Sequence, residues 1–233
     1  MKKCLPVVCL FLTFWVAGGL AWAADPIKLG AFFDLTGAGS AIGTPTKLVA
    51  EMVVKKINGE GGINGRPLQL VIADDEGDPT KAAIIAKKFI ESDKVVAIIG
   101  PTRTDTGMAA KPIIEQMKVP TFMCVGGDPV VTVPPFKWTF KSPQRTSVAV
   151  KKTYDYLKRK GIQNIAIITS ADGFGRDGKN WLEKLAVEYG LKIITGESFQ
   201  ATDNDMTTQL IKIKAASPEA IICWTIGNAG SIV

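Results

Sequence analysis

Short apolar runs rich in valine and isoleucine alternate with longer amphipathic segments along the chain. A short apolar run bounded by glycine, proline or acidic residues is typical of a buried strand. The longer segments have helical spacing: in 78–93, Ala82, Ala86 and Phe89 fall on one face and lysines on the other. The pattern predicts strands at 27–35, 67–75, 95–100, 119–125, 164–170, 191–199 and 220–225.

The strand–helix unit repeats roughly every 25–30 residues, and this repeat predicts parallel sheets with helices on both faces. Segment 126–146 interrupts the repeat, because it contains four prolines and has no helical period. We therefore expect the chain to cross there from one α/β lobe, at 24–142, to a second lobe at 143–233.

Two dipeptides predict helix starts. Asp78-Pro79 and Thr44-Pro45 each offer an N-cap residue followed by proline at the first helical position. The acidic run 74–78 raises the possibility of a calcium loop, but the glycine and glutamate that an EF-hand needs are not at the required spacing. The run is therefore better explained as a turn followed by a helix cap.

The N-terminus has the features of a secretory signal peptide. Two lysines precede an apolar stretch at 5–20, and Ala21-Trp22-Ala23 provides a cleavage signal. This stretch is short for a membrane span, so an uncleaved anchor is the weaker alternative. We expect residues 1–23 to be removed after Ala23 and the mature chain to be exported to the periplasm.

Composition excludes several classes of function. With the two leader lysines removed, 26 basic residues remain beside 22 acidic residues, and they alternate with apolar residues along helices, which indicates solvated faces and no nucleic-acid partner. The absence of histidine excludes Ser-His-Asp and Cys-His catalysis and histidine-ligated metals in these 233 residues. Cys124 and Cys223 remain in the mature chain; a bridge is possible in an oxidising compartment, but two buried, unpaired cysteines are favoured.

A glycine-rich loop suggests a nucleotide site. Residues 35–43, LTGAGSAIG, lie between a predicted strand and a predicted helix, and Tyr154 with Lys158 and the NAG element at 228–230 complete the motifs of short-chain dehydrogenases. The order is wrong, because in that family the NAG element precedes the tyrosine. Ala41 also replaces a glycine that the pyrophosphate needs. A nicotinamide-dependent dehydrogenase stays a remote alternative, and we expect no enzyme, no cofactor and no metal site.

The sequence signature of a known family is found in four longer stretches, 57–90, 100–113, 119–129 and 171–178. These stretches resemble the branched-chain amino acid branch of the type I periplasmic binding proteins. The resemblance implies an α/β fold of two lobes, each a doubly wound parallel sheet flanked by helices. It also implies a monomer that binds a small solute between its lobes and passes it to the permease of an ABC transporter. Family members continue beyond residue 233, so it implies a C-terminal truncation that leaves the second lobe and the returning segments incomplete.

The loop 101–106 is the most informative part of the expected cleft. Its hydroxyls and free N–H groups at a helix start form an anion site suited to a carboxylate. By resemblance, Thr104 is the carboxylate-binding hydroxyl residue, although it could serve only as an N-cap. Gly126 corresponds to a backbone contact, and Gly127 replaces a hydroxyl residue; both could simply form a tight turn.

Other cleft positions are also assigned by resemblance. Phe174, between two glycines in a predicted loop, corresponds to an aromatic residue that closes over the solute, and Ile42 replaces an aromatic contact. The expected ligand-binding set is Thr102, Thr104, Gly126, Gly127, Phe174, Ile42, Trp224 and Thr225.

The identity of the solute stays open. The family's carboxylate that pairs with a ligand ammonium group would lie beyond Val233, so the solute could be a branched-chain or other amino acid, an amide or an aromatic acid. A ligand-sensing extracellular domain of a signalling system is the alternative function.

Overall fold

The computed structural model describes residues 25–233, so the expected signal peptide at 1–23 lies outside the described residues. The chain forms two parallel sheets, with strand orders β2-β1-β3-β4-β5 and β7-β6-β8. The first sheet contains β1 (Ile27–Phe33), β2 (Leu68–Asp74), β3 (Ala97–Ile99), β4 (Thr121–Met123) and β5 (Thr139–Lys141). The second contains β6 (Asn164–Ser170), β7 (Lys192–Phe199) and β8 (Ala220–Trp224).

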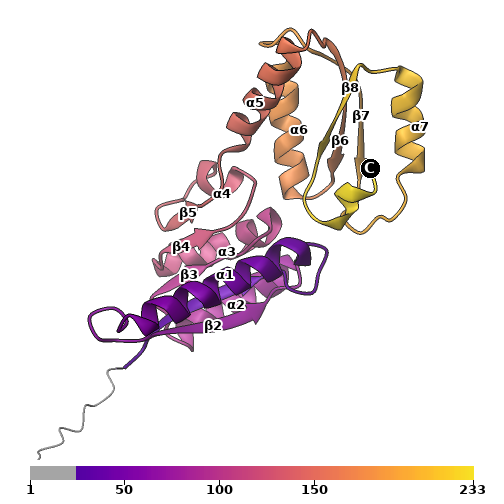
Figure 1. Ribbon diagram of the computed structural model, residues 1–233. Coiled ribbons are helices and arrows are strands. Elements are labelled where there is room, and N and C mark those ends of the chain that lie inside the picture. Colours follow the sequence, from indigo (N-terminus) through magenta and orange to yellow (C-terminus); the bar gives the residue numbers. More distant parts are fainter. Residues whose placement is uncertain (1–24) are drawn as a thin grey trace, which may run out of the picture.

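We call each sheet with its helices a lobe, and Figure 1 shows the two lobes one above the other. The first-lobe helices are α1 (Ser40–Gly59), α2 (Pro79–Glu91), α3 (Thr104–Met117) and α4 (Pro129–Thr132). The second-lobe helices are α5 (Thr146–Arg159), α6 (Gly173–Ala186), α7 (Thr207–Ala216) and the 3₁₀ turn η1 (Asn228–Ser231). Because β2 and β3 lie on opposite sides of β1, right-handed crossovers put α1 and α2 on opposite faces of the first sheet.

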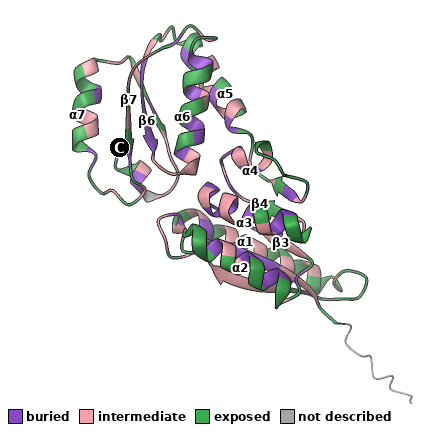
Figure 2. Cartoon of the chain, turned by 180° about the vertical axis from the view of Figure 1, so that it is seen from behind, coloured by how far each residue is buried: buried purple, intermediate pink, exposed green. Residues whose placement is uncertain are grey.

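The predicted α/β class and doubly wound parallel topology are confirmed, and each long predicted strand is found within two residues of its expected ends. The core of the first lobe lies between the sheet and the pair α2 and α3. There the rings of Phe32 and Phe89 meet edge-on, with centroids 6.1 Å apart. Figure 2 shows the buried positions following the inward faces of strands and helices in both lobes.

One predicted helix start is confirmed and one is wrong. The Asp78 carboxylate accepts the N–H groups of Thr80 and Lys81, and Pro79 is the first residue of α2. In contrast, α1 begins at Ser40, which leaves Pro45 inside the helix. The helix starts earlier than the Thr44-Pro45 pattern indicates because the Asp34 carboxylate orders the preceding loop through hydrogen bonds.

The segment that interrupts the repeat contains more structure than its sequence indicates. Within 126–146 the chain forms the single-turn helix α4 and then β5, which pairs in parallel with β4 as the last strand of the first sheet. Both elements are too short to show a periodicity, so neither was predicted. The expected lobe boundary between 142 and 143 stays a prediction.

Tyr154, the tyrosine of the dehydrogenase-like motif, is a core residue of the second lobe. It is fully buried, and its hydroxyl donates to the carbonyl oxygen of Leu182 at 2.8 Å. Burial, with a smaller effect from Glu183, raises the pKa of this hydroxyl far above its ordinary value. The Tyr154 hydroxyl is therefore a structural donor in this fold.

The two mature cysteines are unpaired, as favoured by the sequence, but neither is fully buried, since Cys124 is only half-buried. Cys223 is exposed, contrary to the expectation that both are buried, because β8 is an edge strand of its sheet. Among the helices within 25–233, none is both long enough and apolar enough to cross a membrane.

Truncation of Phe89 tests the core of the first lobe. We expect Phe89→Ala to lower the free energy of unfolding by about 3–5 kcal/mol, because it leaves a cavity against Phe32. Ile84→Ala, at a 63% exposed position of the same helix, should change it by less than about 0.5 kcal/mol. Denaturant unfolding followed by fluorescence measures both, and equal effects would contradict this packing.

Candidate functional site

The loops at the carboxyl ends of the first sheet face the second lobe. Thr102 and Thr104 follow β3 and begin α3, whereas Gly126 and Gly127 follow β4. In open parallel sheets, ligands bind beyond these strand ends, where loops meet helix N-termini. On the other side stand the N-terminus of α6 and the loop after β8, whose Gly227 lies against the carbonyl oxygen of Ala38.

Thr104 and Gly127 form a hydrogen-bonded pair. Thr104 is the buried first residue of α3, and its Oγ1 accepts the N–H of Gly127 at 3.0 Å. A threonine hydroxyl has one donor and two acceptor lone pairs, so this bond leaves the O–H proton available to another acceptor. The N–H of Gly127 is used inside the protein, and its role is to orient Thr104. The N-cap alternative for Thr104 is wrong, because Arg103 holds the N-cap position of α3.

An aromatic stack of the second lobe lies against Gly126 of the first lobe. The rings of Phe174 and Trp224 are stacked with centroids 5.5 Å apart, and a Cβ at Gly126 would lie 2.4 Å from the Phe174 ring. Gly126 is therefore needed for the close approach of this ring. Phe174 is a partly buried residue in the first turn of α6, which corrects the expectation of an exposed loop aromatic. Phe174 is helical because Asp172 caps α6, accepting the N–H of Gly175.

The other three predicted residues form hydrogen bonds within the protein. Thr102 is buried, and its Oγ1 accepts the N–H of Asp34 at 3.2 Å. The carbonyl oxygen of Ile42, in the first turn of α1, accepts the hydroxyl of Thr46. Thr225 donates to the carbonyl oxygen of Ile226. The structure thus brings together five of the predicted residues, and the ligand roles of all eight stay predictions. The five are Thr104, Gly126, Gly127, Phe174 and Trp224.

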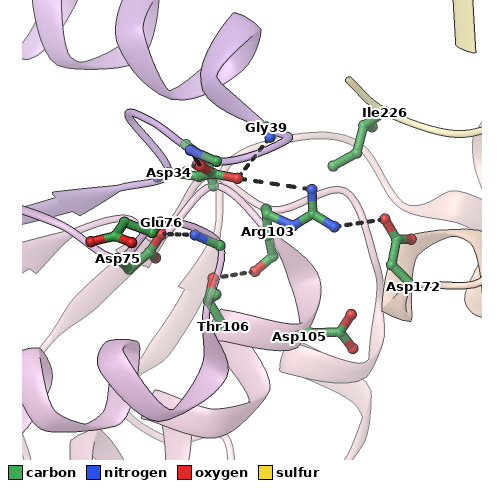
Figure 3. A network of polar contacts seen from close by, with 12 residues as sticks. Asp34, Gly39, Asp75, Glu76, Arg103, Asp105, Thr106, Asp172 and Ile226 are labelled. Carbon is green, nitrogen blue, oxygen red and sulfur yellow. Dashed lines mark hydrogen bonds and ion pairs between the residues drawn. The ribbon is translucent and has the colours of Figure 1, made fainter. Parts of the chain in front are cut away.

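Sequence reasoning missed the charged network at the centre of this region. Figure 3 shows the Arg103 guanidinium between Asp34 of the first lobe and Asp172 of the second. Arg103 Nη2 donates to Asp172 Oδ2 at 3.0 Å, and Arg103 Nη1 lies 3.8 Å from Asp34 Oδ2. Asp34 is fully buried, and the other two side chains are about 10% exposed or less. The sequence does contain one signal for this network, because each of the three charged residues lies at or just beyond the end of a predicted buried strand.

Asp34 also explains the glycine-rich loop. Its two carboxylate oxygens accept the N–H groups of Gly37 and Gly39, each at 2.7 Å. A Cβ at Gly39 would lie 2.6 Å from Asp34 Oδ2, so this approach requires glycine. The amides that would bind a pyrophosphate in a dehydrogenase thus bind a carboxylate of the protein itself. Asp34 also orders the loop so that α1 starts at Ser40.

A second anion from the first lobe reaches the second lobe. Asp105 accepts the N–H of Gly173 at 2.8 Å and pairs with Arg176, also at 2.8 Å. The Asp105 carboxylate therefore stands at the N-terminus of α6, where the helix dipole favours negative charge.

A buried cluster ties the lobes together at their junction. Asp177 of α6 accepts the N–H of Asp128 and the hydroxyl of Thr146, and Asp128 pairs with Lys141 at 3.3 Å. Burial raises the pKa of Asp177 in spite of these hydrogen bonds. The N-terminal half of α6 therefore makes three polar contacts near the cleft, through Asp172, Asp105 and Asp177.

Three carboxylates, those of Asp34, Asp74 and Asp75, have oxygens within 4.8 Å of one another and could in principle hold a cation. The arrangement fits hydrogen-bonded turns better. Asp74 accepts donors from Leu35, Thr36 and Glu76, and Asp34 lies beside a guanidinium. Hydrogen-bond donors thus occupy both oxygens of Asp34 and of Asp74, and among the three carboxylates only Oδ2 of Asp75 has no partner within residues 25–233.

The pKa values of Asp75 and Asp74 are shifted in opposite directions. Burial raises the pKa of Asp75 to about 6, and the nearby Asp34 adds to the shift. Burial also acts upward on the pKa of Asp74, but hydrogen bonds, first from Thr36, outweigh it and hold the pKa below its ordinary value. The turn that follows β2 therefore contains one carboxylate that resists ionisation beside one that favours it.

A cavity of about 400 Å³ lies between the lobes. Its size is in the range of small-molecule sites. A larger cavity of about 710 Å³ lies against the C-terminal half of α3 and the segment 133–138, away from the strand ends. The interlobe cavity is lined by Thr104, Asp105, Met108, Pro129, Gly173, Arg176, Asp177 and Asn180.

Comparison with known proteins agrees with this geometry. The family described as "Periplasmic binding protein" matches residues 26–231. This chain belongs to that family. The leucine-, isoleucine-, valine-, threonine- and alanine-binding protein of Pseudomonas aeruginosa is 27% identical over 218 residues, which cover 91% of this chain and 57% of that protein. The chain thus spans little more than half the length of this curated relative.

Solved structures show the same fold. An extracellular ligand-binding receptor from Rhodopseudomonas palustris superposes with a TM-score of 0.82 and 28% identity, over 89% of this chain and 56% of that one. A solute-binding protein of an ABC transporter from the same species, solved with 3,4-dihydroxybenzoic acid, gives a TM-score of 0.78 at 22% identity, over 86% of this chain and 54% of that one. The second comparison supports the type I periplasmic-binding fold alone.

The raised pKa of Asp75 predicts a pH-dependent stability with a definite sign. The folded state holds a proton between the unfolded pKa of about 4 and the folded pKa of about 6. The stabilisation is therefore complete below about pH 4 and is lost as the pH rises through 6. Asp75→Asn, which stays neutral, should be more stable than the wild type by about 3 kcal/mol at pH 7.5, and the difference should approach zero at pH 4.

Asp74→Asn is the matched control, since the lowered pKa of Asp74 predicts the opposite sign. The stabilisation from Asp74 is present above the unfolded pKa and is lost as the pH falls, so this variant should lose stability at pH 7.5. Denaturant unfolding at the two pH values measures both variants. A stability difference for Asp75→Asn that does not change with pH would show that folding does not raise the pKa of Asp75.

Proposed function

We propose that the chain is the extracytoplasmic substrate-binding component of an ABC transporter, which captures a small carboxylate-bearing solute between its lobes and presents it to the permease. The observation that supports the proposal most directly is the hydrogen bonding of the Thr104 hydroxyl. Its Oγ1 accepts a backbone N–H, and no acceptor for its O–H is found in the described part of the chain. A hydroxyl oriented in this way at a helix N-terminus suits a carboxylate oxygen.

The arrangement suits reversible capture without chemistry. The first lobe offers the Thr104 hydroxyl and the loop of Gly126 and Gly127. The second lobe offers the Phe174 ring, which stacks on Trp224 and closes over Gly126. Binding between two lobes lets the solute stabilise the closed arrangement, because its contacts with both lobes exist only there. This form of recognition needs no catalytic group, consistent with a binding protein rather than an enzyme.

The relatives support a solute class but no single solute. Among them are proteins named for binding leucine, isoleucine and valine, and one solved with an aromatic acid. The proposal therefore covers branched-chain and other amino acids, amides and aromatic acids. It includes export to the periplasm with cleavage after Ala23, a monomeric state and a division between lobes at 142 and 143.

A thermal-shift screen against these three solute classes tests the proposal. A solute present at about 100 times its Kd stabilises the folded state by about 2.7 kcal/mol, which raises Tm by several degrees in a chain of this length. Thr104→Val, which keeps the shape and removes the O–H donor, should weaken binding about ten- to a hundredfold. Thr104→Ser should retain most of the affinity.

Calorimetric titration of the solute identified in the screen compares the three proteins. If no carboxylate raises Tm at millimolar concentration, the capture function is wrong for this chain. If Thr104→Val binds as tightly as the wild type, the carboxylate does not bind at Thr104.

A further inference from the structure

Arg103 is a buried cation whose position is strongly constrained. It is the N-cap residue of α3, and its carbonyl oxygen accepts the Thr106 hydroxyl and the Gly107 N–H. Its aliphatic stem passes between two glycines, since a Cβ at Gly39 or Gly77 would lie 3.3 Å or 3.0 Å from Arg103 Cδ. The guanidinium therefore occupies a fixed place between the lobes.

The hydrogen bonds of this guanidinium are incomplete. Nη2 donates to Asp172, but Nη1 is buried and has no hydrogen-bond partner within residues 25–233. The oxygen of Asp34 is 3.8 Å from Nη1, which is too far for a hydrogen bond, and it already accepts the N–H of Gly39. Figure 3 shows Ile226, from the loop after β8, pointing toward the guanidinium. A buried charged donor without an acceptor is destabilising, so this group favours an occupant that supplies an acceptor.

The surrounding charges define the kind of acceptor. Two carboxylates, Asp34 and Asp172, lie within 4 Å of one guanidinium, so the immediate surroundings are already net negative. A second carboxylate on the solute would add a like charge, and an ammonium group has no lone pair with which to accept the Nη1 hydrogen bond. A neutral oxygen meets neither penalty.

We propose that Arg103 contacts the solute and determines specificity: Nη1 donates a hydrogen bond to a neutral acceptor oxygen, a hydroxyl, keto or amide oxygen, of a solute whose carboxylate binds at Thr104. The inference rests on the proposed function and narrows its solute class to monocarboxylates with such an oxygen. Among carboxylates of equal size, the chain therefore prefers the member that has this acceptor over the member that lacks it.

Two matched pairs of probes test this preference. Benzoate and para-hydroxybenzoate differ by an acceptor far from the carboxylate, and isocaproate and its alpha-keto derivative differ by one next to it. Nuclear magnetic resonance titration measures Kd into the millimolar range and also resolves the side-chain signals of ¹⁵N-labelled arginine. In at least one pair the acceptor-bearing member should bind about ten- to a hundredfold more tightly and shift the Arg103 side-chain signal.

Arg103→Met keeps the aliphatic stem and removes the donors, so it should reduce the preference to within about twofold. Arg103→Lys keeps the charge without the planar fork and should give an intermediate preference. Lys212→Met is the matched control, because it removes an exposed ion pair, with Glu197, whose residues do not line the interlobe cavity. This control should leave the ratio of the two affinities unchanged.

The outcomes separate this inference from the proposed function. If both members of both pairs bind the wild type equally, or if the Arg103 signal does not move, Arg103 does not contact the solute, although capture itself stands. If none of the four probes binds although the thermal-shift screen finds a solute, this inference is wrong and the proposed function stands. If that screen finds no solute either, both proposals are wrong. If Arg103→Met does not fold, the wild-type ratio, the Arg103 signal and Arg103→Lys still decide the question.

Discussion

A cation buried between two lobes needs its counter-charges in place, and Arg103 finds one in each lobe. Removing an ionised group from water costs several kcal/mol unless it is paired. Asp34 comes from the end of β1, Arg103 from the start of α3 and Asp172 from the cap of α6, so their pairing fixes three chain segments at once. Separating the lobes would leave the guanidinium without Asp172, and this contact therefore couples interlobe geometry to the chemistry of the cleft.

Asp34 extends the same constraint into the first lobe. Its carboxylate binds the amides of Gly37 and Gly39, and its own N–H donates to Thr102. The resemblance of this loop to a dinucleotide fingerprint thus has a physical basis, because both arrangements bind an anion on glycine amides. Here the anion is part of the protein, and the loop forms one side of an interlobe cleft.

Much of the architecture could be predicted from local pattern. The long strands, α2 with its Asp78 cap and the parallel topology follow from apolar runs, helical periodicity and turn residues within short windows. The start of α1 and the strand β5 could not be predicted in this way. The first depends on hydrogen bonds from Asp34, and the second is three residues long.

The same limit applies to the site. Thr104 and Phe174 could be proposed from their positions after strands and from family resemblance. The pairing of Arg103 with Asp172 joins residues 69 positions apart, and no local pattern encodes it. The exposure of Cys223 likewise depends on the order of strands in the sheet, which makes β8 an edge.

The most direct test of this account is the distance between the lobes. With Cys124 and Cys223 replaced by serine, spin labels at the exposed positions Lys55 and Lys212 report it by electron paramagnetic resonance. The account predicts one narrow distance distribution for the parent protein, and a longer and broader one when Asp172→Asn removes the charge that Arg103 pairs with. An unchanged distribution in that variant would contradict the central claim that this buried ion pair joins the lobes.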